Sequence, residues 1–296
     1  MRQYPCKACE GIRYDVISCL KTFENEKKKD VISSDWFMSP TEEKRTEKKK
    51  EDFLKTGISG LDELFSEGGI PKGNAVLLAG GAGTGKSTFC RQICYNLVSQ
   101  GKKCMYVSCE EPIDRIEKSM QNFGWNIKKY KDSGHFLIQK INPLDILRMK
   151  FGSLGASDSA AELSYKIKPL VIPRDFAPDV IAVDSLTAII AASLSKEKNY
   201  RVYLQQLFSF FEETGATSFL ISETEQIPTK YSDTGIEEFL ADGIIVLYNI
   251  QRGDIRENAM EIVKMRYSHH QKKMVMMEIT EKGITIYPDR RVFLGK

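Results

Sequence analysis

The chain contains 296 residues, of which 42% are hydrophobic and 28% charged, with a formal net charge of +3. These values suit a soluble globular protein with a sizeable core and exclude collagen-like, mucin-like and wholly disordered chains. The net charge is too small to indicate nucleic-acid binding by itself. Because Asp184 interrupts the longest apolar run and the N-terminus lacks a signal-peptide core, we expect no membrane span and a cytoplasmic location.

Residues 1–53 are predicted to form a charged, partly flexible appendage. Within them, residues 21–52 carry nine Lys or Arg and nine Asp or Glu, which leaves little that could build a core. Cys6 and Cys9 form a CxxC pair and Cys19 offers a third ligand, but a structural zinc site needs four. Two interpretations therefore stay open for these cysteines: they bind zinc in a site shared between chains, or they are free thiols. The remaining cysteines, which we expect to be buried thiols, are Cys90, Cys94, Cys104 and Cys109.

From about residue 54 to residue 290 the pattern is that of one α/β domain, followed by a short tail at 291–296. Short apolar runs alternate with longer amphipathic stretches, as in a mainly parallel sheet flanked by helices. The expected buried strands are 74–79, 104–108, 180–184, 217–222 and 243–248, and the expected helices are 87–100, 112–123 and 196–214. Further strands at 259–267, 273–279 and 284–287 predict an antiparallel extension at the C-terminal end of the sheet.

The strongest local motif is GGAGTGKS at residues 80–87, which satisfies G-x-x-x-x-G-K-[ST] between a predicted strand and a predicted helix. In such a loop the backbone N–H groups and the helix N-terminus surround phosphates, Lys86 contacts the β- and γ-phosphates, and the Ser87 hydroxyl coordinates Mg²⁺. The sequence therefore predicts a nucleoside triphosphate site. The expected contact residues are Gly81, Ala82, Gly83, Thr84, Gly85, Lys86, Ser87 and Thr88.

Acidic residues follow two of the predicted strands. Asp184 ends the run VIAVD, where a carboxylate can hold Mg²⁺ through water, although Asp also caps helices. Glu110 and Glu111 follow the run CMYVS, where a carboxylate can orient an attacking water. The same pair would also suit the start of the helix that follows Pro112. Spacing alone does not decide between these two interpretations.

The motifs and their order resemble the KaiC branch of the RecA/RadA ATPases, in a single-domain form, from about Thr56 to Tyr287. The matching segments are 56–65 (TGISGLDELF), 69–73 (GIPKG), the phosphate loop, 107–112 (VSCEEP), 182–185 (AVDS), 239–247 (FLADGIIVL), 261–266 (EIVKMR) and 279–283 (ITEKG). The resemblance implies a RecA-type core that binds Mg-ATP and hydrolyses it between neighbouring subunits of a homo-oligomer, often a hexameric ring. The appendage lies outside this resemblance.

The resemblance also implies roles for individual residues. Glu110 and Glu111 match the family's paired catalytic glutamates, and Lys86 completes the catalytic set within the chain. Lys264 and Arg266 match basic residues that reach into the next subunit's site, where a cation stabilises charge on the transferred phosphoryl group. Spacing alone would place them on one solvated face of a strand. His270 falls at a position of further nucleotide contact.

Besides a nucleotide-dependent switch or scaffold, the resemblance allows two other functions, that of a Ser/Thr autokinase and that of a DNA-binding ATPase. In the family's autophosphorylating domain, Ser and Thr precede the Asp that Asp242 matches, but Glu238 and Phe239 stand here, which disfavours an autokinase. The loop at 225–238 has more acid than base, which opposes the phosphate contacts of a RecA/RadA-like DNA-binding ATPase. A nucleotide-dependent switch would act on a protein partner, which the sequence does not identify. Loop hydroxyls that could accept phosphate, or serve turn chemistry equally well, are Thr229, Ser232 and Thr234.

Overall fold

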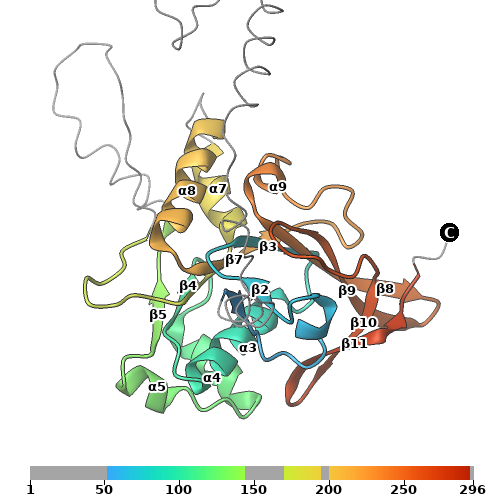
Figure 1. Ribbon diagram of the computed structural model, residues 1–296, viewed down its shortest axis with the longest axis horizontal. Coiled ribbons are helices and arrows are strands. Elements are labelled where there is room, and N and C mark those ends of the chain that lie inside the picture. The colour runs from blue at the N-terminus through green and yellow to red at the C-terminus, as the bar shows by residue number, and fades with distance from the viewer. Residues whose placement is uncertain (1–51, 144–169, 195–199, 294–296) are drawn as a thin grey trace, which may run out of the picture. The chain divides into compact units, whose positions relative to one another are not determined.

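A large β-sheet organises the computed structural model, which describes residues 52–143, 170–194 and 200–293 (Figure 1). The chain divides into two units, residues 1–46 and 47–296; the first, with Cys6, Cys9 and Cys19, lies outside the described residues. The strands of the large sheet are β3 (Ala75–Gly80), β4 (Cys104–Ser108), β5 (Phe136–Lys140), β6 (Val180–Asp184), β7 (Thr217–Glu223), β8 (Gly243–Arg252), β9 (Ile255–Met265), β10 (Val275–Thr280) and β11 (Gly283–Arg291).

The strand order of this sheet, among the described residues, is β11-β10-β9-β8-β3-β7-β6-β4-β5. The run from β8 to β5 is parallel, whereas β9, β10 and β11 continue it as antiparallel strands. This topology confirms the predicted fold class, a mainly parallel sheet with a C-terminal antiparallel extension. A separate small pair joins β1 (Phe53–Leu54) to β2 (Ile70–Pro71).

Helices cover both faces of the parallel region. They are the 3-10 helix η2 (Asp62–Leu64) and the α-helices α3 (Lys86–Ser99), α4 (Ile113–Asn122), α5 (Lys128–Asp132), α7 (Leu186–Leu194), α8 (Tyr200–Thr214) and α9 (Glu237–Leu240). Along β3, Val76 and Leu78 pack with α3 and α4, whereas Leu77 and Ala79 pack with α7 and α8 (Figure 1). A strand buried on both faces needs apolar residues at every position, which explains the unbroken run AVLLAG. None of the described helices is both long and apolar enough to cross a membrane.

The predicted strands, and the helices at 87–100 and 112–123, agree with the structure to within a few residues at each end. Seven of the described elements were not predicted: β1, η2, β2, α5, α7, α9 and β5. Helix α7 has the sequence LTAIIAASL, which lacks the 3.6-residue periodicity of an amphipathic helix. Its apolar residues therefore look like a continuation of the apolar strand before it. Strand β5 is an edge strand with only three apolar residues. The helix predicted at 196–214 is observed as α8 from Tyr200; residues 195–199 lie outside the described residues.

The four described cysteines, Cys90, Cys94, Cys104 and Cys109, are buried free thiols, as predicted. On α8, Phe208 and Phe211 are buried in the core on the face of the sheet that α7 and α8 cover. Both observations favour packing roles for these residues, because small buried thiols and helix aromatics fill core volume.

Gln92 on α3 joins the C-terminal hairpin to the core, and it supplies a test of the packing. Its side chain is buried; Nε2 donates to the Ile284 carbonyl at 3.0 Å, and Oε1 accepts from the Ile284 N–H at 2.6 Å. Replacing Gln92 with Leu leaves both backbone groups without this partner. We expect Gln92→Leu to lower the free energy of unfolding by about 2 kcal/mol, measured by urea denaturation. Gln100→Leu at the exposed helix end is the control, and equal stability of the two variants would contradict the prediction.

Candidate nucleotide-binding site

The predicted phosphate loop connects the carboxyl end of β3 to the first turn of α3. Gly85 precedes the helix with φ of 94°, a left-handed conformation that residues with a side chain rarely adopt. The Thr84 hydroxyl donates to the Gly81 carbonyl at 2.9 Å and closes the loop on itself. Because the first N–H groups of a helix have no partner within it, the loop and the α3 N-terminus form a cradle suited to phosphate.

Lys86 is folded into this loop. Its Nζ donates to the carbonyls of Gly80 and Gly81, each at 2.8 Å, and the side chain is buried. Burial lowers the pKa of Lys86, while the nearby carboxylates of Glu223 and Asp184 act in the opposite direction. The ammonium group therefore lies where phosphate oxygens would compete with the two carbonyls for its hydrogens.

Three carboxylates gather beside the loop at the carboxyl edge of the sheet. The pairing of Gly80 with Glu223 and of Ser108 with Asp184 brings the ends of β3, β7, β6 and β4 to one edge, and Glu110 follows β4. Partial burial raises the pKa of Glu110, as do the neighbouring carboxylates of Glu223 and Asp184. The sequence analysis missed Glu223, although it ends a buried strand just as Asp184 does.

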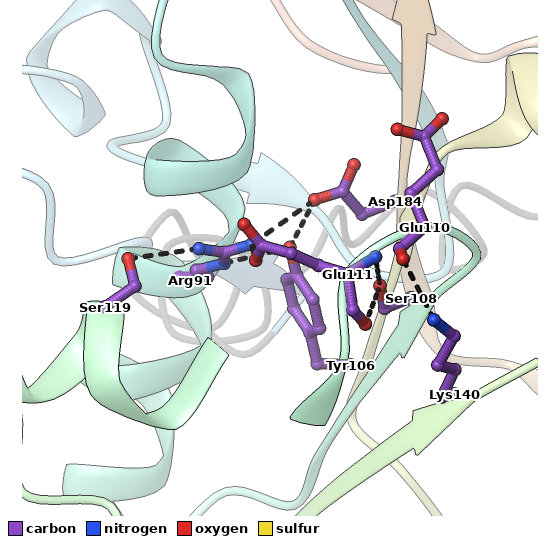
Figure 2. A network of polar contacts seen from close by, with 8 residues as sticks. All are labelled: Arg91, Tyr106, Ser108, Glu110, Glu111, Ser119, Lys140 and Asp184. Carbon is purple, nitrogen blue, oxygen red and sulfur yellow. Dashed lines mark hydrogen bonds and ion pairs between the residues drawn. The ribbon is translucent and has the colours of Figure 1, made fainter. Parts of the chain in front are cut away.

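Glu110 and Glu111 differ in their surroundings (Figure 2). The Glu111 carboxylate pairs with the Arg91 guanidinium, whereas the Glu110 side chain points away from Arg91. The backbone of this turn is held as well: Lys140 donates to the Glu110 carbonyl at 2.9 Å, and Ser108 exchanges two hydrogen bonds of 2.9 Å with the backbone of Glu111. The structure thus brings Glu110, not both glutamates alike, to the open side of the turn.

Asp184 and Ser87 supply oxygen donors of the kind that Mg²⁺ prefers. Asp184 Oδ2 accepts a hydrogen bond of 2.5 Å from the Tyr106 hydroxyl, and Tyr106 is fully buried. In the part of the chain that the structure describes, no group of three His, Cys, Asp or Glu side chains is arranged to hold a metal ion. The Asp184 carboxylate and the Ser87 hydroxyl are oxygen donors that suit a Mg²⁺ ion whose other ligands are phosphates and water.

Lys264 and Arg266 lie together, but far from the phosphate loop of their own chain. The Lys264 ammonium donates to the carbonyls of Glu238 and Ala241 at 2.9 and 2.6 Å. The Arg266 guanidinium donates to the Phe239 carbonyl at 3.0 Å and pairs with Asp242 at 3.1 Å. Burial, and secondly the charge of Arg266, lower the pKa of Lys264.

The strand register gives the separation between this pair and the phosphate loop. On β8, Gly243 pairs with Val76 near the start of β3, and Leu247 pairs with Gly80 at its end. Met265, between the two cations, pairs with Gly243. At about 3.3 Å per residue, the four steps from Gly243 to Leu247 span roughly 13 Å. The two cations therefore lie at the opposite end of the sheet from the loop.

His270 is placed close to the same end of the sheet, but it is turned inward. Both ring nitrogens are shielded from solvent. Desolvation lowers the pKa of His270, and the charge of Lys272 contributes in the same direction. In this arrangement neither ring nitrogen of His270 is exposed to a nucleotide.

A Gly-rich loop between a central parallel strand and a helix, with carboxylates at the ends of neighbouring strands, defines an α/β P-loop nucleotide-binding protein. The KaiC ATPase family matches residues 54–291. The chain therefore belongs to the KaiC ATPase family.

Similar proteins include single-domain and longer members. A UPF0273 protein from Pyrococcus furiosus is 32% identical over 82% of this chain and 97% of its own length. The crystal structure of a KaiC-like protein from Pyrococcus horikoshii OT3 is 33% identical, covers 80% of this chain and 99% of that chain, and superposes with a TM-score of 0.65. The circadian clock protein KaiC3 from Synechocystis sp. is 32% identical over 79% of this chain, which spans only 45% of that protein.

Proposed function

We propose that this protein hydrolyses ATP at the interface between successive subunits of a head-to-tail homo-oligomer, and that nucleotide state switches its assembly or its contact with a protein partner. The observation that carries the proposal is the position of Lys264 and Arg266. They lie at the opposite end of the sheet from their own phosphate loop, so they could act on ATP only in a neighbouring copy. A head-to-tail contact that closes gives a ring, and the hexamer expected from the resemblance stays a prediction.

The proposed chemistry assigns a task to each group near the loop. Lys86 and the backbone amides of the loop bind the phosphates, and Glu110 orients the attacking water and accepts its proton. Glu110 suits this task because its raised pKa makes it a stronger base than an ordinary glutamate. Mg²⁺, held through Ser87 and the water-linked Asp184, would neutralise charge on the transferred phosphoryl group. A cation from the next subunit, Arg266 or Lys264, would complete that stabilisation.

The remaining assignments rest on the sequence. We propose that residues 54–290 form the ATPase domain, that residues 1–53 act as a polar tether, and that the protein works in the cytoplasm. Two of the three hydroxyls that could accept phosphate are engaged locally: Thr234 donates to Glu237 at 2.8 Å, and Ser232 accepts from the Gly235 N–H at 3.1 Å. These are turn contacts, so we propose neither an autokinase nor, given the acidic loop at 225–238, a DNA-binding ATPase.

Mixing two inactive variants tests the shared site. Lys86→Ala damages the phosphate loop but keeps Arg266, whereas Arg266→Ala keeps the loop but removes the cation offered to the neighbour. We expect each variant alone to release little phosphate from ATP. In randomly mixed rings, half the loops are intact and half of those face an intact Arg266, so about a quarter of the sites should recover.

The two variants are combined before Mg-ATP is added, and phosphate release is compared with that of each variant alone. A mixture no more active than its components, or an Arg266→Ala protein that hydrolyses ATP normally by itself, would show that the site is not shared. Solution mass with and without Mg-ATP, measured on the same samples, shows whether assembly has taken place.

A further inference from the structure

Arg91 is a buried arginine on α3, five residues after Lys86, and the nucleotide chemistry proposed above does not use it. Only 5% of its surface is exposed. Its guanidinium contacts four groups (Figure 2): Nε donates to the Tyr106 hydroxyl at 3.1 Å, Nη1 donates to the Ser119 hydroxyl at 3.1 Å, and Nη2 pairs with the Glu111 carboxylate and, at 3.8 Å, with Asp184 Oδ2. These partners come from β4, from α4, from the turn between them and from the end of β6.

A buried guanidinium is costly to desolvate unless it is paired and hydrogen-bonded, and an apolar side chain would often fill such a place as well. Arginine differs from other side chains in its planar fork of donors, which fixes several partners in one geometry. The Tyr106 hydroxyl, which accepts from Arg91, donates in turn to Asp184 at 2.5 Å. One side chain therefore connects the phosphate-loop helix to both carboxylate-bearing strand ends.

Hydrogen bonds to backbone groups also hold the turn that carries Glu110. Cys109 N–H donates to the Asp184 carbonyl at 2.7 Å, Lys140 donates to the Glu110 carbonyl at 2.9 Å, and Ser108 bonds the Glu111 backbone. The Arg91–Glu111 pair adds the side-chain anchor on the α3 side. With Glu111 fixed in this way, the backbone from which the Glu110 side chain extends is held as well.

We propose that Arg91 is a positioning residue that separates the roles of the two glutamates, holding Glu111 as an anchor so that Glu110 faces the nucleotide, with Tyr106 extending the constraint to Asp184. This inference rests on the proposed ATPase function. It predicts that the Arg91–Glu111 pair acts as one unit in the rate of hydrolysis and does little for nucleotide binding.

A double-mutant cycle on the full chain tests the pair. The variants are Arg91→Lys, which keeps the charge but cannot reach all four partners, Glu111→Gln, which keeps the shape, and the combination of both. We expect each single change to lower kcat by roughly 10- to 100-fold, because a misplacement of about 1 Å costs that much, while the Kd for ATP changes less than about threefold. The double variant should be no slower than the slower single variant, because both changes break the same contact.

Two further variants sharpen the cycle. Arg115→Ala removes an exposed arginine from the neighbouring helix α4 and should leave kcat unchanged. Tyr106→Phe removes the hydroxyl that bonds Asp184 and leaves the Arg91–Asp184 ion pair at 3.8 Å. We expect kcat to fall at least about fivefold with ATP affinity retained. The melting temperature of each variant shows whether a variant with a lowered kcat is still folded.

The results distinguish this inference from the function on which it rests. If the unmodified protein releases no phosphate from ATP, the proposed function fails and the inference fails with it. If the protein is active but the single effects multiply in the double variant, or the losses appear in Kd, Arg91 does not position Glu111. A fall for Glu111→Gln as large as that for Glu110→Gln would make Glu111 a reacting group and overturn the division of roles.

Discussion

Lys86→Ala is expected to lower the rate of ATP hydrolysis by roughly three orders of magnitude, because it removes a donor aimed at the transferred phosphoryl group inside a buried loop. The Lys86 ammonium already lies between two loop carbonyls at 2.8 Å, so it needs little reorganisation to meet phosphate oxygens. ATP affinity should fall as well, since the same cation contacts the bound nucleotide. Phosphate release and titration with a fluorescent ATP analogue measure the two effects.

The control for this change is Lys102→Ala. Lys102 is a half-exposed lysine just beyond α3, where it pairs with Asp179 at 3.5 Å, and an exposed ion pair contributes little. Its removal should alter neither rate nor affinity. If Lys86→Ala hydrolysed ATP within about tenfold of the unmodified protein, Lys86 would not be the phosphate-binding lysine of an ATPase.

Glu110→Gln is expected to lower kcat by roughly 10²- to 10⁴-fold while ATP still binds, because the amide keeps the shape of the side chain but cannot accept the proton of water. Binding should hold or tighten, since a negative charge near Glu223, Asp184 and the phosphates is removed. In the unmodified protein, only the deprotonated carboxylate acts as a base. The rate should therefore fall as pH drops through the raised pKa of Glu110, at a pH above the ordinary glutamate value of 4.5.

Steady-state rates across pH, together with ATP affinity at one pH, check this prediction. Glu117→Gln on α4, half-exposed and paired with Lys131, is the matched control and should behave like the unmodified protein. If the Glu110→Gln protein kept both its kcat and the fall of its rate at low pH, another group would accept the proton. Glu223, on the same edge of the sheet, is the alternative.

The parts of the site that sequence reasoning could find are those encoded locally. The phosphate loop is contiguous, so its glycines, Lys86 and Ser87 can be read from one motif flanked by a strand and a helix. Asp184 and Glu110 follow from a second local rule, that parallel strands present their carboxyl ends at one edge. Glu223 obeys the same rule, and the end of TSFLISE offered the same signal.

The Arg91 network could not be found in this way. Tyr106 and Ser119 lie 15 and 28 residues beyond Arg91, at separations that no helix or strand period relates. They meet because β4 packs against α3, a consequence of how the sheet and its helices assemble. A charged side chain on a helix is also most often solvated, so its burial here depends on tertiary packing.

Hydrophobic periodicity and short motifs act over a few residues, so the class of fold, the phosphate loop and the chain order of the predicted strands and helices follow from the sequence alone. Alternation along a strand likewise placed Lys264 and Arg266 on one side. The assembled fold places these cations at the far end of the sheet from their own loop, pairs Glu111 with Arg91 and directs Glu110 away from Arg91. The reason is that strand register and helix docking join residues far apart in the chain, and local patterns do not carry those distances.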